Sequence, residues 1–397
     1  MNLANLIINK NNNIVYDLKT LIKENFTNKI PNINDLLVFC TDNKCSDLYL
    51  KVGDRPFISR YGLIYRVPTF ELTNKIWQEW AKYAITSENN AKYVRQKMLD
   101  FSYCIPYNLI KESRENIKIS NVTKDEKEKE KKKIIESENN FEFRYRVSAG
   151  FSSNKNIASF RMISKELPTF NKINFPKKEE NILKEIAKKR SGITMFCGVT
   201  GSGKSTTFAS AINDFSKSGE PFDNSVMISL EDPVEYKYKS TDSFYIMQKE
   251  LGVDFKAFDL GVKQALREHP NFINVGETRD KETINTLVES ARTGHSVWTS
   301  FHSSDVADTI SRLYNYLINY NSEIMYDLIA NINLILCQRL IPSEKGFKLN
   351  TQYMVFNDSI VVYLNKMIEE GKNIPTEINK LFKNEQLIKY GLVKDWD

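Results

Sequence analysis

The 397-residue sequence has few cysteines and no long apolar run. Its cysteines are odd in number and scattered along the chain: Cys40, Cys45, Cys104, Cys197 and Cys337. This pattern is typical of a reducing compartment and not of a disulfide framework. No window approaches the ~20 apolar residues of a membrane span, and no basic segment precedes an apolar stretch at the N-terminus. We therefore expect a cytoplasmic protein, which could still bind a membrane peripherally.

Patterns for metal and nucleic-acid binding are also missing. Cys40 and Cys45 are close in sequence, but no second cysteine pair or neighbouring histidine completes a tetrahedral site, so we expect no zinc. The net charge of +6 is mild for this length. No stripe of clustered arginine and aromatic residues indicates that nucleic acid is a direct ligand. The chain does have 41% apolar residues, and it is long enough for two domains.

One glycine-rich segment carries the clearest functional signal. Residues 198–206, GVTGSGKST, match the pattern G-x-x-x-x-G-K-[ST], follow an apolar strand predicted at 192–197 and precede a helical pattern. In such a loop the glycines let backbone N–H groups turn toward a phosphate, Lys204 supplies a positive charge and the Ser205 hydroxyl can bind Mg²⁺. We expect nucleotide phosphates to be bound by Gly198, Thr200, Gly201, Ser202, Gly203, Lys204, Ser205 and Thr206.

The periodicity of the chain changes after a proline-containing linker. Before it, alternating and helical patterns predict helices at 33–39 and 73–85 and strands at 46–52, 57–61, 63–67, 141–149 and 157–163. After it, helices alternate with short apolar strands at 192–197, 226–230, 271–275 and 296–300, which predicts a mainly parallel sheet covered by helices. A further strand at 353–356 and helices at 360–369 and 375–383 are predicted near the C-terminus.

These patterns divide the chain into five parts. We predict an N-terminal extension at 1–30, a first domain at 31–166 with a charged insertion near 112–140, a linker at 167–179, an α/β domain at 180–345 and a C-terminal strand with helices at 346–397.

Acidic residues follow two of the predicted parallel strands. Glu231 comes directly after the strand at 226–230, and Glu277 follows the strand at 271–275. Ligands of such folds bind at the carboxyl ends of the strands. Either residue could orient or deprotonate an attacking water, and of the two we favour Glu277 as the base. Each also has a simpler interpretation as a helix cap or a surface charge.

The only three histidines all lie between positions 269 and 302. His302 follows the strand at 296–300, so we expect it at the same sheet edge as the phosphate loop, where it could sense or bind a γ-phosphate. We interpret His295 as a packed polar residue and His269 as part of a surface turn.

Several segments together resemble the secretion ATPases of the PilT/GspE class. They are the phosphate loop, EDPVEY, ALREHPNFINVGETRDKETI and TGHSVWTSFHSSDVADTISRL, which correspond in order to the Walker A, Asp box, Walker B and His box segments of that class. SDLYLKVGDRPFISRYGLIYR resembles the start of its N-terminal domain. The resemblance implies an α/β protein in which a PAS-like α+β domain precedes a RecA-like P-loop ATPase domain with a small helical C-terminal part. RYRVSAG and CQRLIPSEKGFKLNTQYMVFN look closer to the DotB/TraJ branch of type IVB secretion and conjugation.

The resemblance also implies a function. The protein would be a homo-hexamer that hydrolyses ATP with Mg²⁺ at the junction of its two domains and drives an inner-membrane secretion machine. Arg144, Arg146 and Arg161 match the arginines that would complete the site, although each could be a solvent-facing strand residue. A pilus retraction ATPase, a nucleotide-gated docking protein with little turnover and a nucleic-acid translocase remain as alternatives.

The chain departs from the family pattern in the Walker B strand. Asn271 and Asn274 stand where an acid and an aliphatic residue are frequent, and His269 replaces a common aspartate. Magnesium contacts are therefore expected from Ser205 and Glu231, partly through water. The charged insertion is longer than expected, and the four-cysteine zinc element of some members is absent.

Overall fold

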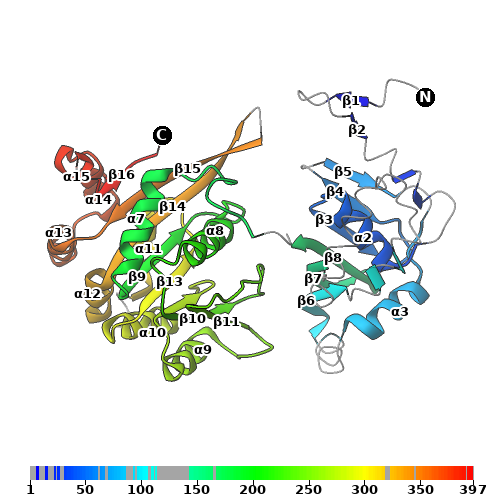
Figure 1. The fold of residues 1–397 in the computed structure, drawn as a ribbon, viewed down its shortest axis with the longest axis horizontal. Coiled ribbons are helices and arrows are strands. Elements are labelled where there is room, and N and C mark those ends of the chain that lie inside the picture. The colour runs from blue at the N-terminus through cyan, green and yellow to red at the C-terminus, as the bar shows by residue number, and fades with distance from the viewer. Residues whose placement is uncertain are drawn as a thin grey trace. The chain divides into compact units, whose positions relative to one another are not determined.

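The structure is a computed structural model. It describes residues 6–8, 14–16, 22–23, 25–26, 31–60, 63–67, 70–85, 93, 96–105, 109–110, 112–113, 143–163, 167–317, 322–343, 346–389 and 391–396. The chain forms two compact units, Met1–Lys165 and Glu166–Asp397 (Figure 1). Most of the predicted N-terminal extension and nearly all of the charged insertion lie outside the described residues. No helix among the described residues is both long enough and apolar enough to cross a membrane.

The first unit contains a six-stranded antiparallel sheet with two main helices. The strand order is β5 (Leu63–Arg66), β4 (Phe57–Arg60), β3 (Asp47–Lys51), β8 (Lys155–Ile163), β7 (Phe143–Ser152) and β6 (Met98–Ile105). The helices are α2 (Ile33–Asp42) and α3 (Asn74–Ala84), and β1 (Leu6–Ile8) pairs antiparallel with β2 (Ile14–Tyr16) in a separate two-stranded sheet. The elements predicted here are present, and β1, β2 and β6 are additional strands.

Local signals and burial explain these elements. Helix α2 starts with a capping box, in which the side chains of Asn32 and Asp35 each accept a hydrogen bond from the other's backbone N–H. Along β7, Tyr145 and Val147 are buried whereas Arg144 and Arg146 point to the other face, so the predicted alternation is confirmed.

The second unit is built on an eight-stranded sheet. The strand order is β11 (Phe244–Glu250), β10 (Ser225–Glu231), β12 (Phe272–Val275), β13 (Ser296–Phe301), β9 (Gly192–Cys197), β14 (Ile332–Ser343), β15 (Gly346–Val355) and β16 (Val393–Lys394). The strands from β11 to β14 pair in parallel, and β15 and β16 are antiparallel additions. All four parallel strands predicted for this region are present. Strands β11 and β14 were not predicted, and β15 is longer than the segment expected at 353–356.

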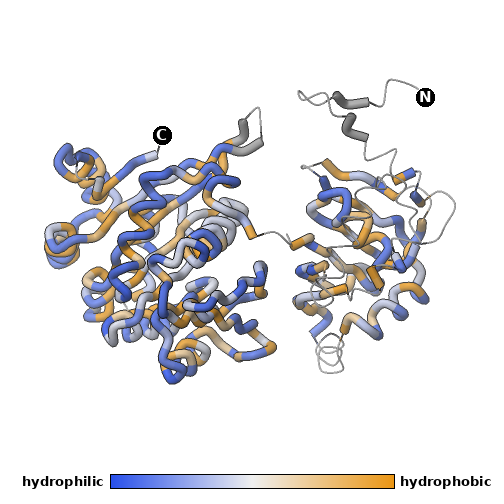
Figure 2. Tube along the Cα trace, in the orientation of Figure 1, coloured by the Kyte–Doolittle hydropathy of each residue, from blue (hydrophilic) through white to orange (hydrophobic). Residues whose placement is uncertain are grey.

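Helices cover both faces of this sheet. They are α7 (Lys177–Lys188), α8 (Lys204–Ser218), α9 (Phe258–Ala265), the 3₁₀ turn η2 (Leu266–Glu268), α10 (Lys281–Arg292), α11 (Val306–Leu317), α12 (Ser322–Asn331), α13 (Asp358–Glu369), α14 (Ile374–Phe382) and α15 (Glu385–Lys389). Figure 2 shows apolar stretches along the strands, while the helices mix apolar and polar residues. Such amphipathic helices bury one face against a sheet.

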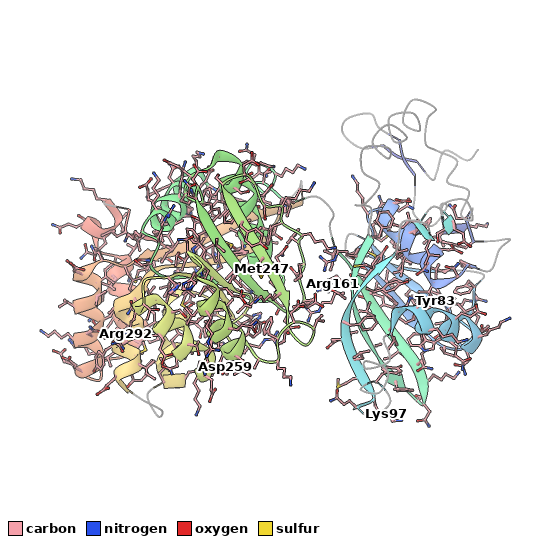
Figure 3. All side chains as sticks on the ribbon, turned by 60° about the horizontal axis from the view of Figure 1, so that its bottom comes forward. Tyr83, Lys97, Arg161, Met247, Asp259 and Arg292 are labelled. Carbon is pink, nitrogen blue, oxygen red and sulfur yellow. The ribbon has the colours of Figure 1, made fainter. Side chains whose placement is uncertain are left out.

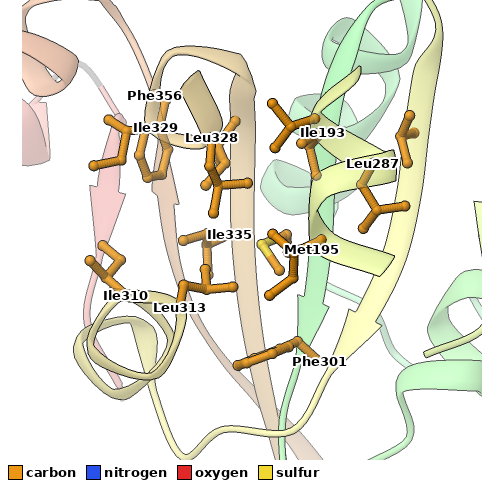
Figure 4. Close-up of a cluster of buried hydrophobic side chains, with 14 of the residues drawn as sticks. Ile193, Met195, Leu287, Phe301, Ile310, Leu313, Leu328, Ile329, Ile335 and Phe356 are labelled. Carbon is orange, nitrogen blue, oxygen red and sulfur yellow. The ribbon is translucent and has the colours of Figure 1, made fainter. Parts of the chain in front are cut away.

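Two different cores lie on the two faces of the sheet. One is aliphatic and packs α9 to α14 against the strands; Figure 4 shows Met195 of β9 beside Ile335 of β14, with Leu313 of α11 nearby. The other is aromatic and packs α7 and α8 on the opposite face around Phe196 and Trp298. The phosphate loop leads directly into α8, so this aromatic face supports it.

We predict that Phe222 is a main support of the aromatic core. Its side chain is fully buried and contacts the rings of Phe244, Phe272 and Trp298 at centroid distances of 4.8, 4.9 and 5.9 Å. Phe222→Ala should lower the free energy of unfolding of this unit by about 3–5 kcal/mol, because it removes a ring and leaves a cavity. Urea unfolding followed by circular dichroism would measure the change. Tyr245→Ala, at a half-exposed ring in the same unit, is the control and should cost far less; equal stabilities of the two variants would contradict the prediction.

Candidate nucleotide-binding site

The phosphate loop connects the buried strand β9 to helix α8. The N–H of Gly198 donates to the carbonyl of Phe301 at 3.2 Å, which ties the start of the loop to the end of β13. Gly198 has φ +150°, and a Cβ there would lie 2.4 Å from the Ser202 Oγ. Gly203 caps α8 in the left-handed region with φ +89°. Only glycine fits these two positions without strain, so the loop's shape follows from its sequence.

Lys204, the first residue of α8, is held inside the loop. Its Nζ donates to the carbonyls of Gly198 and Val199 at 2.6 and 3.1 Å. Burial lowers the pKa of the ammonium, and the negative charges of Glu277 and Glu235 act in the opposite direction. The cation therefore lies at the N-terminus of a helix, where unpaired N–H groups and the helix dipole also favour an anion.

The other predicted phosphate-binding residues line the same turn. Thr200, Gly201 and Ser205 are exposed, whereas Ser202 is buried. The Thr206 hydroxyl lies 3.4 Å from that of Tyr236, so the EDPVEY segment reaches the start of α8.

Gln338 of β14 holds the phosphate loop through a hydrogen bond. Sequence reasoning did not predict this residue. Its Nε2 donates to the carbonyl of Ser202 at 2.8 Å, and its side chain is only 1% exposed. A Cβ on Gly203 would lie 3.2 Å from the same nitrogen. The contact joins positions 136 residues apart, and only the parallel pairing of β14 with β9 creates it.

The ends of β10 and β12 meet through Gly276. Its N–H donates to the carbonyl of Leu230 at 2.7 Å, and a Cβ there would lie 3.3 Å from the Cα of Glu231. Because Gly276 has no side chain, the backbones at the ends of β10 and β12 approach closely. Glu231 and Glu277 therefore follow from adjacent strand ends.

Glu277 lies in a cluster of charged groups. Its Oε2 accepts a hydrogen bond from Arg279 at 2.7 Å, and its Oε1 lies 3.0 Å from Nε2 of His302. Arg279 also pairs with Asp232 at 3.3 Å, so it bridges the two acidic segments. Arg279 was not among the predicted site residues. Because Arg279 is half-exposed, these pairs add little stability, and their main effect is to orient the Glu277 carboxyl.

Glu231 lies in a quite different environment. It is 8% exposed, and its Oε1 accepts hydrogen bonds from Ser229 Oγ at 2.6 Å and Gln248 Nε2 at 2.8 Å. Burial raises the pKa of this carboxyl to about 7, and the two hydrogen bonds act in the opposite direction. Among the described residues no three His, Cys, Asp or Glu side chains gather in a way that could hold a metal ion.

The remaining candidates and histidines belong to other elements. Arg146 of β7 is directly opposite Arg161 of β8, and Arg144 is two residues away on the same face, so the three arginines gather on the first unit (Figure 3 labels Arg161). Arg161 pairs with Asp47 at 3.1 Å. His295 is half-buried against Ser290, and His269 is an exposed residue with φ +51° that ends η2.

The parallel sheet, the phosphate loop and the acidic residues at the sheet edge define a P-loop nucleotide-binding protein. Residues 117–372 match the family described as "Type II/IV secretion system protein". The chain therefore belongs to this family of secretion and pilus motors, whose P-loop ATPases bind and hydrolyse ATP.

The relatives include pilus and secretion proteins. The chain is 31% identical over 204 residues to the "Type IV pilus ATPase PilU" of Pseudomonas aeruginosa, covering 51% of each. The match thus spans about half the length of that relative. The structure of the pilus retraction motor PilT with bound ADP is 26% identical, covers 89% of this chain and 93% of its own, and has a TM-score of 0.67. The Legionella pneumophila ATPase DotB shares the fold at 24% identity and a TM-score of 0.67, covering 93% of this chain and 95% of its own.

We predict that Gln338→Leu weakens nucleotide binding about tenfold. The change removes the donor to the Ser202 carbonyl and so loosens the loop, at a cost of about 1–2 kcal/mol for one buried hydrogen bond. Titration with a fluorescent ATP analogue would measure the affinity. The same substitution at the exposed Gln386 of α15 is the control and should leave affinity unchanged. Wild-type affinity in Gln338→Leu would show that the loop does not need this support.

Glu231 should make stability depend on pH. The pKa of this carboxyl is about 7 in the folded chain and near its ordinary 4.5 in the unfolded chain, so the folded state binds its proton more tightly. The contribution of this bound proton to the free energy of unfolding is complete below about pH 4.5 and is lost as pH rises to about 7. Glu231→Gln cannot ionise, so between pH 4.5 and 8 it should gain about 3 kcal/mol relative to the wild type.

Urea unfolding at several pH values would test this expectation. Glu289→Gln, at an exposed position on α10, serves as the control and should follow the wild-type profile. Parallel profiles for Glu231→Gln and the wild type would contradict the prediction.

Proposed function

We propose that this protein is the motor ATPase of a type IV secretion apparatus of the type IVB and conjugation kind. In this proposal it works in the cytoplasm as a homo-hexamer and docks on the cytoplasmic face of an inner-membrane complex. The observation that carries the ATPase activity is the meeting of Lys204, Glu277 and His302 at one edge of the parallel sheet. Nucleic acid is not a direct ligand in this proposal.

The phosphate loop would hold the nucleotide. Lys204 would exchange its two loop carbonyls for phosphate oxygens, which are stronger partners for an ammonium. Residues 198–206 would contribute backbone N–H groups at the start of α8.

A magnesium ion suits the oxygen donors at this edge. Mg²⁺ in nucleotide sites takes only one or two protein oxygens, with phosphates and water completing its shell. The exposed Ser205 hydroxyl fits this role directly, and the buried Glu231 carboxyl, already holding two donors, fits contact through water. When bound, the ion would neutralise phosphate charge.

Glu277 is the proposed base. Its carboxyl is 20% exposed and lies beside Arg279 and His302, so an attacking water can reach it, whereas Glu231 is buried. Release of either His302 or Arg279 would free one oxygen to orient and deprotonate the attacking water. His302 would then sense the γ-phosphate.

The arginines of the first unit would complete the site. Arg144, Arg146 and Arg161 share one sheet face, which supports a joint role in neutralising the charge that develops on the γ-phosphate. Domain movement would then be coupled to hydrolysis.

The secretion assignment rests on two segments that resemble the DotB/TraJ branch, RYRVSAG in β7 and CQRLIPSEKGFKLNTQYMVFN along β14 and β15. Pilus retraction is the second candidate, because PilU and PilT are among the relatives. The segment 357–366 at the start of α13 does not resemble the retraction motif, which favours secretion. A deletion strain separates the two: loss of protein secretion or DNA transfer supports the proposal, and excess piliation supports retraction.

We predict that Glu277→Gln lowers ATP turnover at least a hundredfold and leaves nucleotide affinity within about twofold. The amide keeps the shape of the side chain and cannot accept the proton of the attacking water. Turnover would be measured with Mg²⁺ alongside the mass in solution with and without ATP. Lys204→Ala is the companion variant and should lose both binding and turnover.

The outcomes separate the rival functions. Turnover by a wild-type hexamer that Glu277→Gln loses supports the motor. Normal hydrolysis by Glu277→Gln would refute the assigned base. Nucleotide-dependent assembly without turnover, even with membranes, would favour a docking protein, and stimulation by DNA would favour a nucleic-acid translocase.

A further inference from the structure

A row of polar side chains crosses three strands beside the candidate site. Ser229 of β10 lies directly opposite Asn274 of β12 on one side and Gln248 of β11 on the other. Side chains two positions earlier, Met227 and Phe272, belong to the aromatic core under α7 and α8. Because strand side chains alternate between faces, the polar row lies on that same face, which also supports α8 and its phosphate loop.

The donors and acceptors in this row leave only one direction for each hydrogen bond. The amide Nδ2 of Asn274 can only donate, and it donates to Ser229 Oγ at 2.7 Å. Ser229 has a single hydroxyl proton, and it must point to the acceptor on its other side, Glu231 Oε1 at 2.6 Å. Asn274 therefore determines where the proton of Ser229 points, and Ser229 in turn holds the carboxyl of Glu231.

The same carboxyl oxygen is held from the opposite side. Gln248 Nε2 donates to Glu231 Oε1 at 2.8 Å and to the carbonyl of Tyr236 at 2.7 Å, while its Oε1 accepts from the N–H of Tyr238 at 2.9 Å. Backbone groups thus fix Gln248, and Glu231 Oε1 accepts from two donors, Ser229 on its own strand and Gln248 on the neighbouring strand β11.

The cost of this arrangement indicates that it has a role. Asn274 and Ser229 are 5% and 0% exposed. Burying their polar groups costs free energy, and because their hydrogen bonds do no more than offset this cost, the pair adds little net stability. An aliphatic side chain on β12 would fill the same space in the sheet without such groups. The side chain of Asn271, the other unexpected asparagine, accepts a hydrogen bond from the N–H of Val226 at 2.8 Å, near the opposite end of the strands.

We infer that Asn274 is a positioning residue that, through Ser229, fixes the carboxyl of Glu231 in the orientation used with the magnesium-bound nucleotide. This inference rests on the proposed function and adds to it a residue that the Walker B pattern does not contain. Asn274, which departs from the Walker B pattern, therefore connects the segment that ends in Glu231 to the strand that precedes Glu277, and does not weaken the site.

Four variants test the role of Asn274. Asn274→Leu and Ser229→Ala should each lower kcat for ATP about tenfold. KM should rise no more than about fivefold, because the phosphate loop itself is untouched and only the Mg²⁺-dependent part of ATP binding is weakened. The double variant should be no worse than the more damaging single one, since both changes break the same chain of hydrogen bonds. Asn274→Asp keeps the shape, cannot donate to Ser229, and should lower kcat at least as much; it also serves if Asn274→Leu does not fold.

Asn271→Leu is the matched control. It removes one hydrogen bond from the same segment at a point unconnected to Glu231, so kcat should stay within twofold of the wild type. An unchanged kcat in Asn274→Leu, an equal loss in Asn271→Leu, or multiplied losses in the double variant would each overturn the inference.

A binding measurement separates this inference from the proposed function. Affinity for a fluorescent ATP analogue is measured with and without Mg²⁺, which requires no hydrolysis. Mg²⁺ should raise the affinity of Asn274→Leu by a factor about fivefold smaller than it does for the wild type. Without Mg²⁺ the two affinities should be equal. If the wild type shows no turnover but this loss appears, the motor proposal fails and the positioning role stands. If the Mg²⁺ gain is unchanged in Asn274→Leu, the positioning role fails whatever the turnover.

Discussion

Parallel pairing of β10, β12, β13 and β9 is the constraint on which the candidate site depends. Because the carboxyl ends of parallel strands meet at one edge of the sheet, the first residues of each loop that follows a strand lie at that edge. The phosphate loop follows β9, Glu231 ends β10, Glu277 follows β12 and His302 follows β13. Backbone contacts tighten this edge, from Gly198 to Phe301 and from Gly276 to Leu230. The site is therefore a property of the sheet, and each segment contributes only a part.

The two acidic residues at this edge differ because their surroundings differ. Glu277 has a guanidinium and an imidazole beside it and is partly exposed, so its negative charge is compensated. Glu231 is buried with neutral donors, and its pKa is raised to about 7. One carboxyl suits proton abstraction, and the other suits a fixed orientation near a cation. Asn274 and Gln248 supply that orientation from the neighbouring strands, so the polar row belongs to the site as much as the loop does.

Sequence reasoning predicted the elements whose signals are local. The predictions include four apolar strands of the parallel sheet, the α2 and α3 segments and the alternation in β7. Each follows from a pattern of apolar residues that burial of one face imposes on the sequence. Strand β11 was not, since its second half is polar and its pairing with β10 is what makes it a strand. Gln338, Gln248 and Arg279 were missed for a related reason: each acts on a residue or segment whose proximity exists only after folding. A polar residue inside a predicted apolar strand, as at Asn274, is the one signal that could have found part of this network.

The sequence by itself determined the chemistry available to this protein and the family to which it belongs. Glycines at 198 and 203, the lysine that begins α8, and acids after apolar strands specify phosphate binding wherever such a loop forms, because the requirement is local backbone geometry. Only the tertiary structure decided which carboxyl is buried, which is ion-paired, and that an asparagine on β12 acts through a serine on β10. These properties depend on strand register and burial, and a hydrogen bond or a pKa shift arises from distances between segments far apart in the chain.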